Sequence, residues 1–132
     1  EWVNDRLECD ELKEAVEIRG YVQERELIRL YASAEVFLFP SLHETFGLPI
    51  IEAMASGTPV VTSNCYSMPE IVGKAGITVD PHSEYEIMTA IKQIIENKRV
   101  AERLSGEGIE RAYEFTWDKT ARMMKEVYTS IL

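Results

Sequence analysis

Two carboxylates, those of Glu44 and Glu52, are separated by seven residues in the most informative stretch of this sequence, residues 39–61. Between them we expect a loop that feeds the N-terminus of a helix, where free N–H groups and the helix dipole favour an anion such as phosphate. Carboxylates aimed at the anion would repel it, so each should be turned aside to accept hydrogen bonds from hydroxyl groups. A diphosphate with a sugar at one end and a ribose at the other would fit this arrangement.

The residue types around the two glutamates predict the elements that position them. Residues 36–39 form a continuous apolar run, which suits a strand buried on both faces of a parallel sheet. Pro49 fits the first turn of a helix, Gly57 fits its end, and a second strand opens at residues 59–63. The sequence therefore predicts a strand, a loop, a helix and a second strand in this order.

The loop before the helix would hold the anion with its backbone. We expect the N–H groups of residues 46–50 to point outward, and Gly47 to allow a close approach that a Cβ would obstruct. Glu44 precedes the helix and Glu52 lies one turn into it, so the pair would bracket the anion. The spacing alone leaves an ordinary loop acid and a solvated helix glutamate open, since such a pair recurs by chance in a chain with 23 acidic residues. Glu52 nevertheless lies in the most apolar helix of the chain, which has few polar residues to form a solvent-exposed side.

At these residues the sequence resembles the donor half of GT-B glycosyltransferases of the glycosyltransferase group 1 type. That family includes glycogen and sucrose synthases and many mannosyltransferases, and its E-x7-E motif matches Glu44 through Glu52. The surrounding pattern, Glu-x-Phe-Gly-Leu-Pro…Glu-Ala-Met-Ala-x-Gly-x-Pro-Val-Val, is reproduced without a gap. The resemblance covers roughly residues 15–132 and includes four further landmarks, at residues 20–22, 68–70, 76–81 and 115–117.

The resemblance implies a retaining enzyme that takes a hexosyl unit from a nucleotide-sugar, such as a UDP- or GDP-hexose, with no metal or other cofactor in the donor site. Glu44 would be the catalytic residue, binding hydroxyls of the donor sugar near the anomeric centre. The backbone at Phe46, Gly47 and Leu48 would contact the sugar and the distal phosphate. His43 adjoins Glu44 and is either a donor contact or a solvated loop residue.

On the nucleotide side, the resemblance implies that Glu52 binds the ribose diol. Tyr21 and Val22 would lie beside the base and contribute mainly backbone contacts. The sequence agrees with a metal-free donor site, because it contains no Asp-x-Asp motif and no His or Cys cluster. Cys9 and Cys65 are far apart and form neither a metal-binding nor a redox motif.

The resemblance also predicts that this chain is one part of a larger enzyme. Family domains begin with two further strand–helix units, which carry an Arg and a Lys that neutralise the diphosphate, and residues 1–14 match that pattern poorly. The N-terminal acceptor-binding domain has no counterpart here, so we expect the isolated chain to be inactive and to need that domain or a partner chain. The alternatives are a separate donor-binding subunit and a non-catalytic structural domain of the same fold.

Strands and helices alternate along the rest of the chain. We expect a strand at residues 15–19, where the pattern alternates, and a short strand at residues 76–79. Helices are expected over residues 24–34, 84–97 and 98–113, and residues 67–72 form a turn or a short helix. A last helix from Thr116 would place an apolar stripe that includes Met124 and Tyr128 on one face. This alternation predicts one α/β domain over residues 1–132, a parallel-sheet Rossmann-like layer that forms part of a GT-B C-terminal domain, with its ligand at the carboxyl edge of the strands.

The expected strand order leaves a gap in this sheet. In a Rossmann-like order, two missing strands would lie between the strand at residues 15–19 and the strand at residues 36–39. Either the sheet is rearranged, or a second copy in a homo-oligomer, another chain or residues outside this sequence complete it.

The formal net charge of −9 argues against binding to nucleic acids or to anionic lipid surfaces. Nucleic acids and anionic lipid surfaces attract proteins through Lys and Arg, so we expect no nucleic acid partner and no membrane contact by this domain. The 132 residues include no signal peptide and no apolar stretch of membrane-spanning length, and we expect a cytoplasmic protein.

Overall fold

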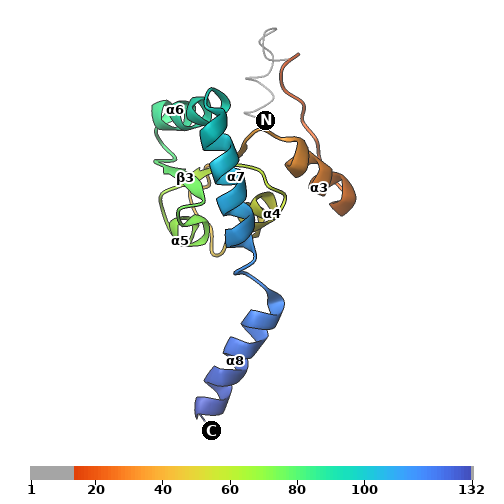
Figure 1. The fold of residues 1–132 in the computed structure, drawn as a ribbon, viewed down its shortest axis with the longest axis vertical. Helices are drawn as coiled ribbons and strands as arrows, with labels where there is room; N and C mark the ends of the chain where they lie inside the picture. The colour runs from red at the N-terminus through yellow and green to blue at the C-terminus, as the bar shows by residue number, and fades with distance from the viewer. Residues whose placement is uncertain (1–13, 132) are drawn as a thin grey trace.

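Three parallel strands and six helices make up residues 14–131, the part of the chain that the computed structural model describes (Figure 1). Their order is α3 (Glu24–Ser33), β1 (Phe37–Phe39), α4 (Leu48–Ala55), β2 (Val60–Ser63), α5 (Met68–Val72), β3 (Gly76–Val79), α6 (Glu84–Ile95), α7 (Lys98–Ala112) and α8 (Trp117–Ile131). The strands lie in the order β1-β2-β3, with Phe37 beside Val60 and Val60 beside Gly76. The three strands predicted at residues 36–39, 59–63 and 76–79 are confirmed.

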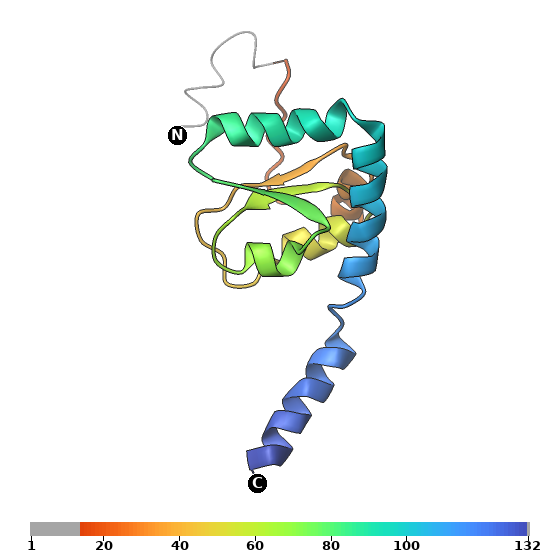
Figure 2. The ribbon, with the colours of Figure 1, turned by 60° about the vertical axis from the view of Figure 1, so that its left-hand side comes forward.

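The central strand β2 is buried along its whole length because helices cover both faces of the sheet. Val60 joins one apolar cluster with the buried side chains of α4 and α5, and its neighbour Val61 joins another with those of α6. Helix α7 serves both clusters, with Leu104 in the second and Ala112 in the first. Figure 2 shows α6 along one side of the sheet, α4 and α5 along the other, and α7 crossing the edge between them.

Helix α7 continues through Gly106 and Gly108, although two glycines should weaken or end a helix. Gly108 is buried, and a Cβ there would lie 3.5 Å from the Met54 side chain of α4. This distance is ordinary van der Waals contact, so the site would also admit an alanine. Helix α7 packs on α4 at this position, and this tertiary packing outweighs the loss in helix propensity.

Arg111 joins the end of α7 to the end of α5. Its guanidinium donates hydrogen bonds to the Ile71 and Glu70 carbonyl oxygens, at 3.0 and 2.7 Å, and lies 4.8 Å from the centre of the Phe115 ring. A cation at the carboxyl end of a helix is favoured by the helix dipole. The contact fixes α7, and the chain that leaves it, against the layer that contains α4 and α5.

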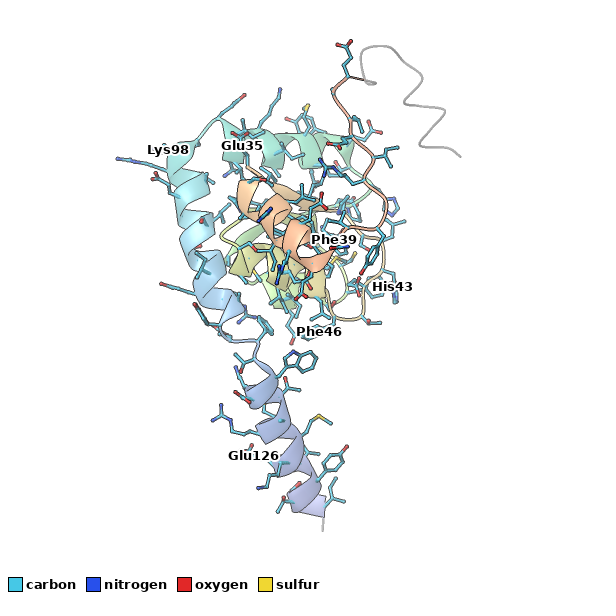
Figure 3. All side chains as sticks on the ribbon, turned by 90° about the vertical axis from the view of Figure 1, so that its right-hand side faces the viewer. Glu35, Phe39, His43, Phe46, Lys98 and Glu126 are labelled. Atoms are coloured by element: carbon cyan, nitrogen blue, oxygen red, sulfur yellow. The ribbon has the colours of Figure 1, made fainter. Side chains whose placement is uncertain are left out.

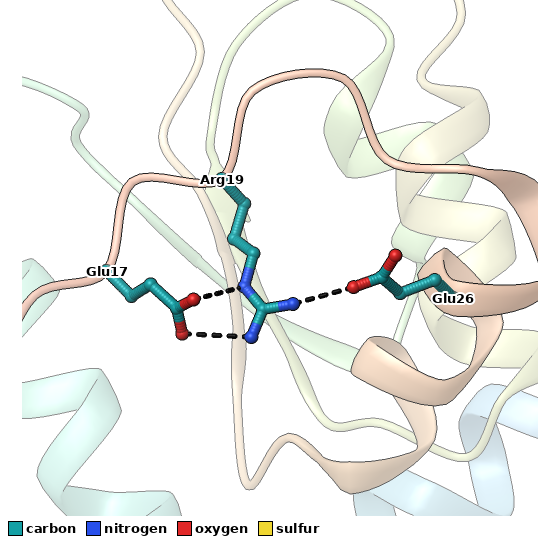
Figure 4. Close-up of polar contacts among 3 residues, drawn as sticks. All are labelled: Glu17, Arg19 and Glu26. Carbon is teal, nitrogen blue, oxygen red and sulfur yellow. Dashed lines mark hydrogen bonds and ion pairs between the residues drawn. The ribbon is translucent and has the colours of Figure 1, made fainter.

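The strand predicted at residues 15–19 is wrong. These residues lie in irregular, exposed chain, and in the described part of the molecule β1 has only β2 as a neighbour. A strand forms only where a neighbouring strand satisfies its backbone groups, and no described strand lies beside this segment. Arg19 instead pairs with Glu17 at 2.7 Å and with Glu26 of α3 at 2.6 Å (Figure 4). The prediction for residues 1–14 falls, except for its last residue, outside the described residues.

Helix α8 begins as predicted, since the Thr116 hydroxyl caps it by accepting a hydrogen bond from the Lys119 N–H group at 3.2 Å. Its predicted apolar stripe, which includes Met124 and Tyr128, is exposed, and no residue of α8 is buried. Figures 1 and 2 show the helix extending away from the sheet and its covering helices. None of the helices described is both long and apolar enough to cross a membrane.

The contact between β3 and its neighbours generates a stability prediction. A Cβ at Gly76 would lie 2.3 Å from a methyl carbon of Val72 and 2.9 Å from the Val60 carbonyl oxygen. Because backbone cannot easily move aside, Gly76→Ala should lower the free energy of unfolding by about 2 kcal/mol or more. The matched control is Gly106→Ala, which meets no atom within 4 Å and should raise it by up to about 1 kcal/mol. Urea unfolding measures both, and equal effects of the two substitutions would contradict this packing.

Candidate functional site

Hydroxyl groups of β2 hold the start of the loop that follows β1. The buried Thr62 donates a hydrogen bond to the Phe39 carbonyl oxygen at 2.9 Å, and the buried Ser63 donates one to the Ser41 carbonyl oxygen at 2.6 Å. Phe39 is the last residue of β1, and Ser41 lies just beyond the strand. The side chains of the central strand thus continue the pairing beyond the carboxyl edge and fix the direction of the loop.

Ser67, in the chain after β2, holds the middle of the same loop. Its hydroxyl lies 3.0 Å from the Glu44 carbonyl oxygen and 3.1 Å from that of Phe46. The Phe46 ring makes an edge contact with the Phe115 ring, with 6.2 Å between the ring centres. Figure 3 places His43 and Phe46 away from Glu35 and Lys98, which lie toward the other end of the sheet. The loop is therefore positioned at the carboxyl edge of the strands, as predicted.

Glu44 is half-buried and folds back on its own loop. Its Oε1 atom accepts hydrogen bonds from the Thr45 N–H group at 3.0 Å and the Phe46 N–H group at 3.4 Å. The Phe46 N–H group is therefore engaged, although we expected it to point outward. This carboxylate shapes the loop with one oxygen, and its Oε2 atom accepts no hydrogen bond within the described residues.

Two backbone N–H groups remain open at the start of α4. Pro49 has no N–H group, and Ile50 donates its own to the Gly47 carbonyl oxygen at 3.0 Å. Within residues 14–131, neither Gly47 nor Leu48 has an acceptor for its N–H group. The first turn of α4 also contains no acidic side chain that would offset its dipole. The outward N–H groups expected over residues 46–50 are thus reduced to two.

Gly47 has the left-handed conformation, with φ of 101°, that a side chain would strain. A Cβ at this position would also lie 3.2 Å from the Ile50 side chain. The residue is the N-cap of α4 without a capping side chain, so the helix end is left free for an external acceptor. No three His, Cys, Asp or Glu side chains among the described residues are placed to hold a metal ion.

Glu52 lies one turn into α4, on a side of the helix that is exposed. The helix thus has a solvated side, so the apolar composition of α4 does not distinguish Glu52 from an ordinary surface glutamate. Its Oε2 atom accepts a hydrogen bond from the hydroxyl of Tyr31 in α3, at 3.3 Å. Sequence reasoning missed Tyr31, because its helical spacing with Leu27 predicts only a core residue.

Tyr21 and Val22 belong to the irregular chain before α3. The Tyr21 side chain is 96% exposed, and no hydrogen bond of the described residues joins it to either glutamate. The contact that both residues are predicted to make with a base therefore stays a prediction. His43, in contrast, packs on the Tyr66 ring at 4.4 Å between ring centres, and Tyr66 has a positive φ of 53°.

The surroundings of Tyr31 raise the pKa of its phenol to about 12, through burial first and then through the negative charge and hydrogen bond of Glu52. In the unfolded chain the pKa of a tyrosine is about 10, so the folded protein holds the Tyr31 proton more tightly than the unfolded chain does. The resulting stabilisation of the fold is fully present below pH 10 and is lost as the pH rises toward 12.

Tyr31→Phe removes this titration. We expect the parent protein to lose more unfolding free energy than the Tyr31→Phe variant between pH 9 and pH 11, when both are followed by urea unfolding. Tyr113→Phe, at an exposed tyrosine, serves as the control. Identical pH profiles of the parent and the Tyr31→Phe variant would contradict the assignment.

Comparisons with known proteins agree with this architecture. Residues 1–97 match the family described as "Glycosyl transferases group 1". The chain is 40% identical over 109 residues to the O-antigen chain mannosyltransferase B of Escherichia coli, covering 83% of this chain and 29% of that protein. It is 38% identical over 121 residues to the MMP alpha-(1->4)-mannosyltransferase of Mycolicibacterium hassiacum, covering 89% of this chain and 29% of that protein. It thus spans less than a third of these relatives.

The fold is also that of a solved structure. The sucrose-phosphate synthase of Thermosynechococcus elongatus superposes with a TM-score of 0.87 and 30% sequence identity, over 98% of this chain and 33% of that one. The predicted α/β class with a parallel sheet is confirmed by this similarity and by the strand order β1-β2-β3. The chain belongs to the glycosyl transferases group 1 family and has the fold of part of a GT-B glycosyltransferase.

Proposed function

We propose that this chain is the donor-binding part of a retaining glycosyltransferase that transfers a hexosyl unit from a nucleotide-sugar to an acceptor. The observation that supports it most is the open N-terminus of α4, where Gly47 and Leu48 offer two N–H groups between Glu44 and Glu52. Membership of a glycosyltransferase family supports the same assignment. Because two relatives are named mannosyltransferases, a mannosyl donor such as GDP-mannose is the first to test, beside UDP-hexoses.

In this proposal the diphosphate of the donor lies at the first turn of α4. Two N–H groups and the positive end of the helix dipole would stabilise the charge that develops on the leaving diphosphate as the bond to the sugar breaks. The orientation of helix α4 is fixed, because Ile50, Ala53 and Met54 are fully buried in the core. In this proposal the donor is bound without a metal ion. The remaining negative charge of the diphosphate would be neutralised by basic side chains elsewhere in the intact protein.

The two glutamates would act on opposite sides of the diphosphate. Glu44 keeps its Oε2 atom open after Oε1 has bonded to the loop, and we assign this oxygen to a hydroxyl of the donor sugar. Glu52 would accept hydrogen bonds from the ribose diol, while the chain at Tyr21 and Val22 would lie beside the base. The acceptor would be held by an N-terminal domain or a partner chain.

The ribose assignment predicts the behaviour of Glu52→Gln. Hydrogen bonds to a charged group contribute about 1.5–3 kcal/mol each, so the intact protein should bind a nucleoside diphosphate at least about tenfold more weakly. Glu96→Gln is the matched control, since Glu96 is exposed at the end of α6, near the Glu35 and Lys98 end of the sheet. Titration calorimetry with UDP, GDP and ADP measures both variants. Unchanged affinity in Glu52→Gln for every nucleotide that the parent binds would defeat the assignment.

The sugar assignment predicts a different result for Glu44→Gln. Glutamine keeps an oxygen for the Thr45 and Phe46 N–H groups, so the loop is preserved while the charge that faces the sugar is lost. We expect kcat for sugar transfer to fall at least about tenfold, with the affinity for the nucleoside diphosphate alone changed less than about twofold. Steady-state kinetics and calorimetry on the intact protein separate the two quantities. Parallel losses in both would show that Glu44 acts on the nucleotide or on folding.

A further inference from the structure

The carboxylate of Glu52 has one described side-chain partner, the hydroxyl of Tyr31 at 3.3 Å from its Oε2 atom. The two residues are 21 positions apart and come from different helices, α4 and α3. Helix α3 is amphipathic and packs on α4, yet a phenylalanine would fill the same core position. The hydroxyl of Tyr31 is therefore the feature that packing alone does not explain.

Two contacts hold Tyr31 in place besides its hydrogen bond to Glu52. Its ring packs edge-on against Phe37 of β1, with 5.2 Å between ring centres, and only 8% of the residue is exposed. Its carbonyl oxygen accepts a hydrogen bond of 2.6 Å from the buried hydroxyl of Thr58, just beyond the end of α4. Glu52, in contrast, is exposed. The fixed partner is the tyrosine, so the tyrosine sets the position of the carboxylate.

We infer that Tyr31 is a positioning residue for nucleotide binding, which holds the Glu52 carboxylate ready for the two hydroxyls of a ribose; this inference rests on the proposed function. A carboxylate offers about four acceptor positions, of which the tyrosine takes one on Oε2. Oε1 and the remaining position on Oε2 are then left for a diol. An exposed glutamate would lose rotamer freedom on binding, and a carboxylate that is already oriented avoids much of that cost.

The protonation of Tyr31 is compatible with this role. Burial and the Glu52 charge raise the pKa of the phenol to about 12, so the hydroxyl remains a donor at any pH used for binding. Arg25 and Arg29 of α3 are exposed and make no described hydrogen bond to Glu52. The tyrosine thus supplies the orienting hydrogen bond without carrying a charge of its own.

The test is a double-mutant cycle read out by discrimination between ribose and deoxyribose. Tyr31→Phe, Glu52→Gln and the double variant of the intact protein are titrated with UDP, GDP and ADP and with their 2′-deoxy forms. Tyr113→Phe, at an exposed tyrosine, is the control, and thermal unfolding reports whether each variant is folded. The ratio of the two affinities isolates the contact to the ribose, because a general loss of packing would weaken both ligands alike.

We expect Tyr31→Phe to weaken binding of the ribonucleotide about two- to tenfold, to leave binding of the 2′-deoxy form nearly unchanged, and to add little to Glu52→Gln in the double variant. If Glu52→Gln loses the ribose preference and Tyr31→Phe retains it, the inference is overturned and the proposed function stands. If Glu52→Gln retains the preference, or the parent binds no nucleoside diphosphate, the proposed function fails and the inference falls with it.

Discussion

Helix α4 must keep its first turn open at the carboxyl edge of the sheet, and the rest of the site depends on that constraint. Gly47 and Leu48 offer N–H groups that no described acceptor takes, and the left-handed glycine at the N-cap provides no side chain to cover them. An unpaired N–H group that is removed from water costs about 1–3 kcal/mol, which an anion at this place would offset. The fully buried Ile50 and Met54 fix the helix in the core, so the open end cannot move to find another partner.

Hydroxyl side chains outside α4 complete the arrangement. Thr62 donates a hydrogen bond to the last residue of β1, and Ser63 and Ser67 lie within hydrogen-bond distance of carbonyl oxygens of the loop that follows. The loop that carries Glu44 is thus held from β2 and from the chain after it. Tyr31 does the same for Glu52 from α3. The two glutamates are thus positioned by different elements, and the loop and helix between them present the anion site.

Much of the fold was predictable because proline and glycine residues mark where helices and strands begin and end. Pro49 and Gly57 mark the bounds of α4 closely, and the three strands of the sheet are short apolar runs with clear ends. The strand predicted at residues 15–19 failed because an alternating pattern cannot show whether a neighbouring strand exists. Helix α7 continues through Gly106 and Gly108 because it packs on α4, and this packing is equally invisible in the sequence.

The candidate site was predictable in its residues and less so in its contacts. The E-x7-E motif singled out Glu44 and Glu52; the match to the family confirms the resemblance, whereas the roles given to both residues stay predictions. The hydrogen bonds from Thr45 and Phe46 to Glu44 arise from the local path of the loop. The bond between Tyr31 and Glu52 joins two helices, and only the folded chain brings them together.

The most direct test of the account observes the open helix end itself. Labelling phenylalanine with ¹³C at the carbonyl and glycine with ¹⁵N singles out the amide of Gly47, because Phe46-Gly47 is the one Phe-Gly pair in this chain. We expect the Gly47 amide resonance of the intact protein to shift progressively as a nucleoside diphosphate is added, and the shift to saturate at the affinity measured by calorimetry. A nucleotide that saturates the protein while the Gly47 resonance stays in place would contradict the claim that α4 holds the diphosphate.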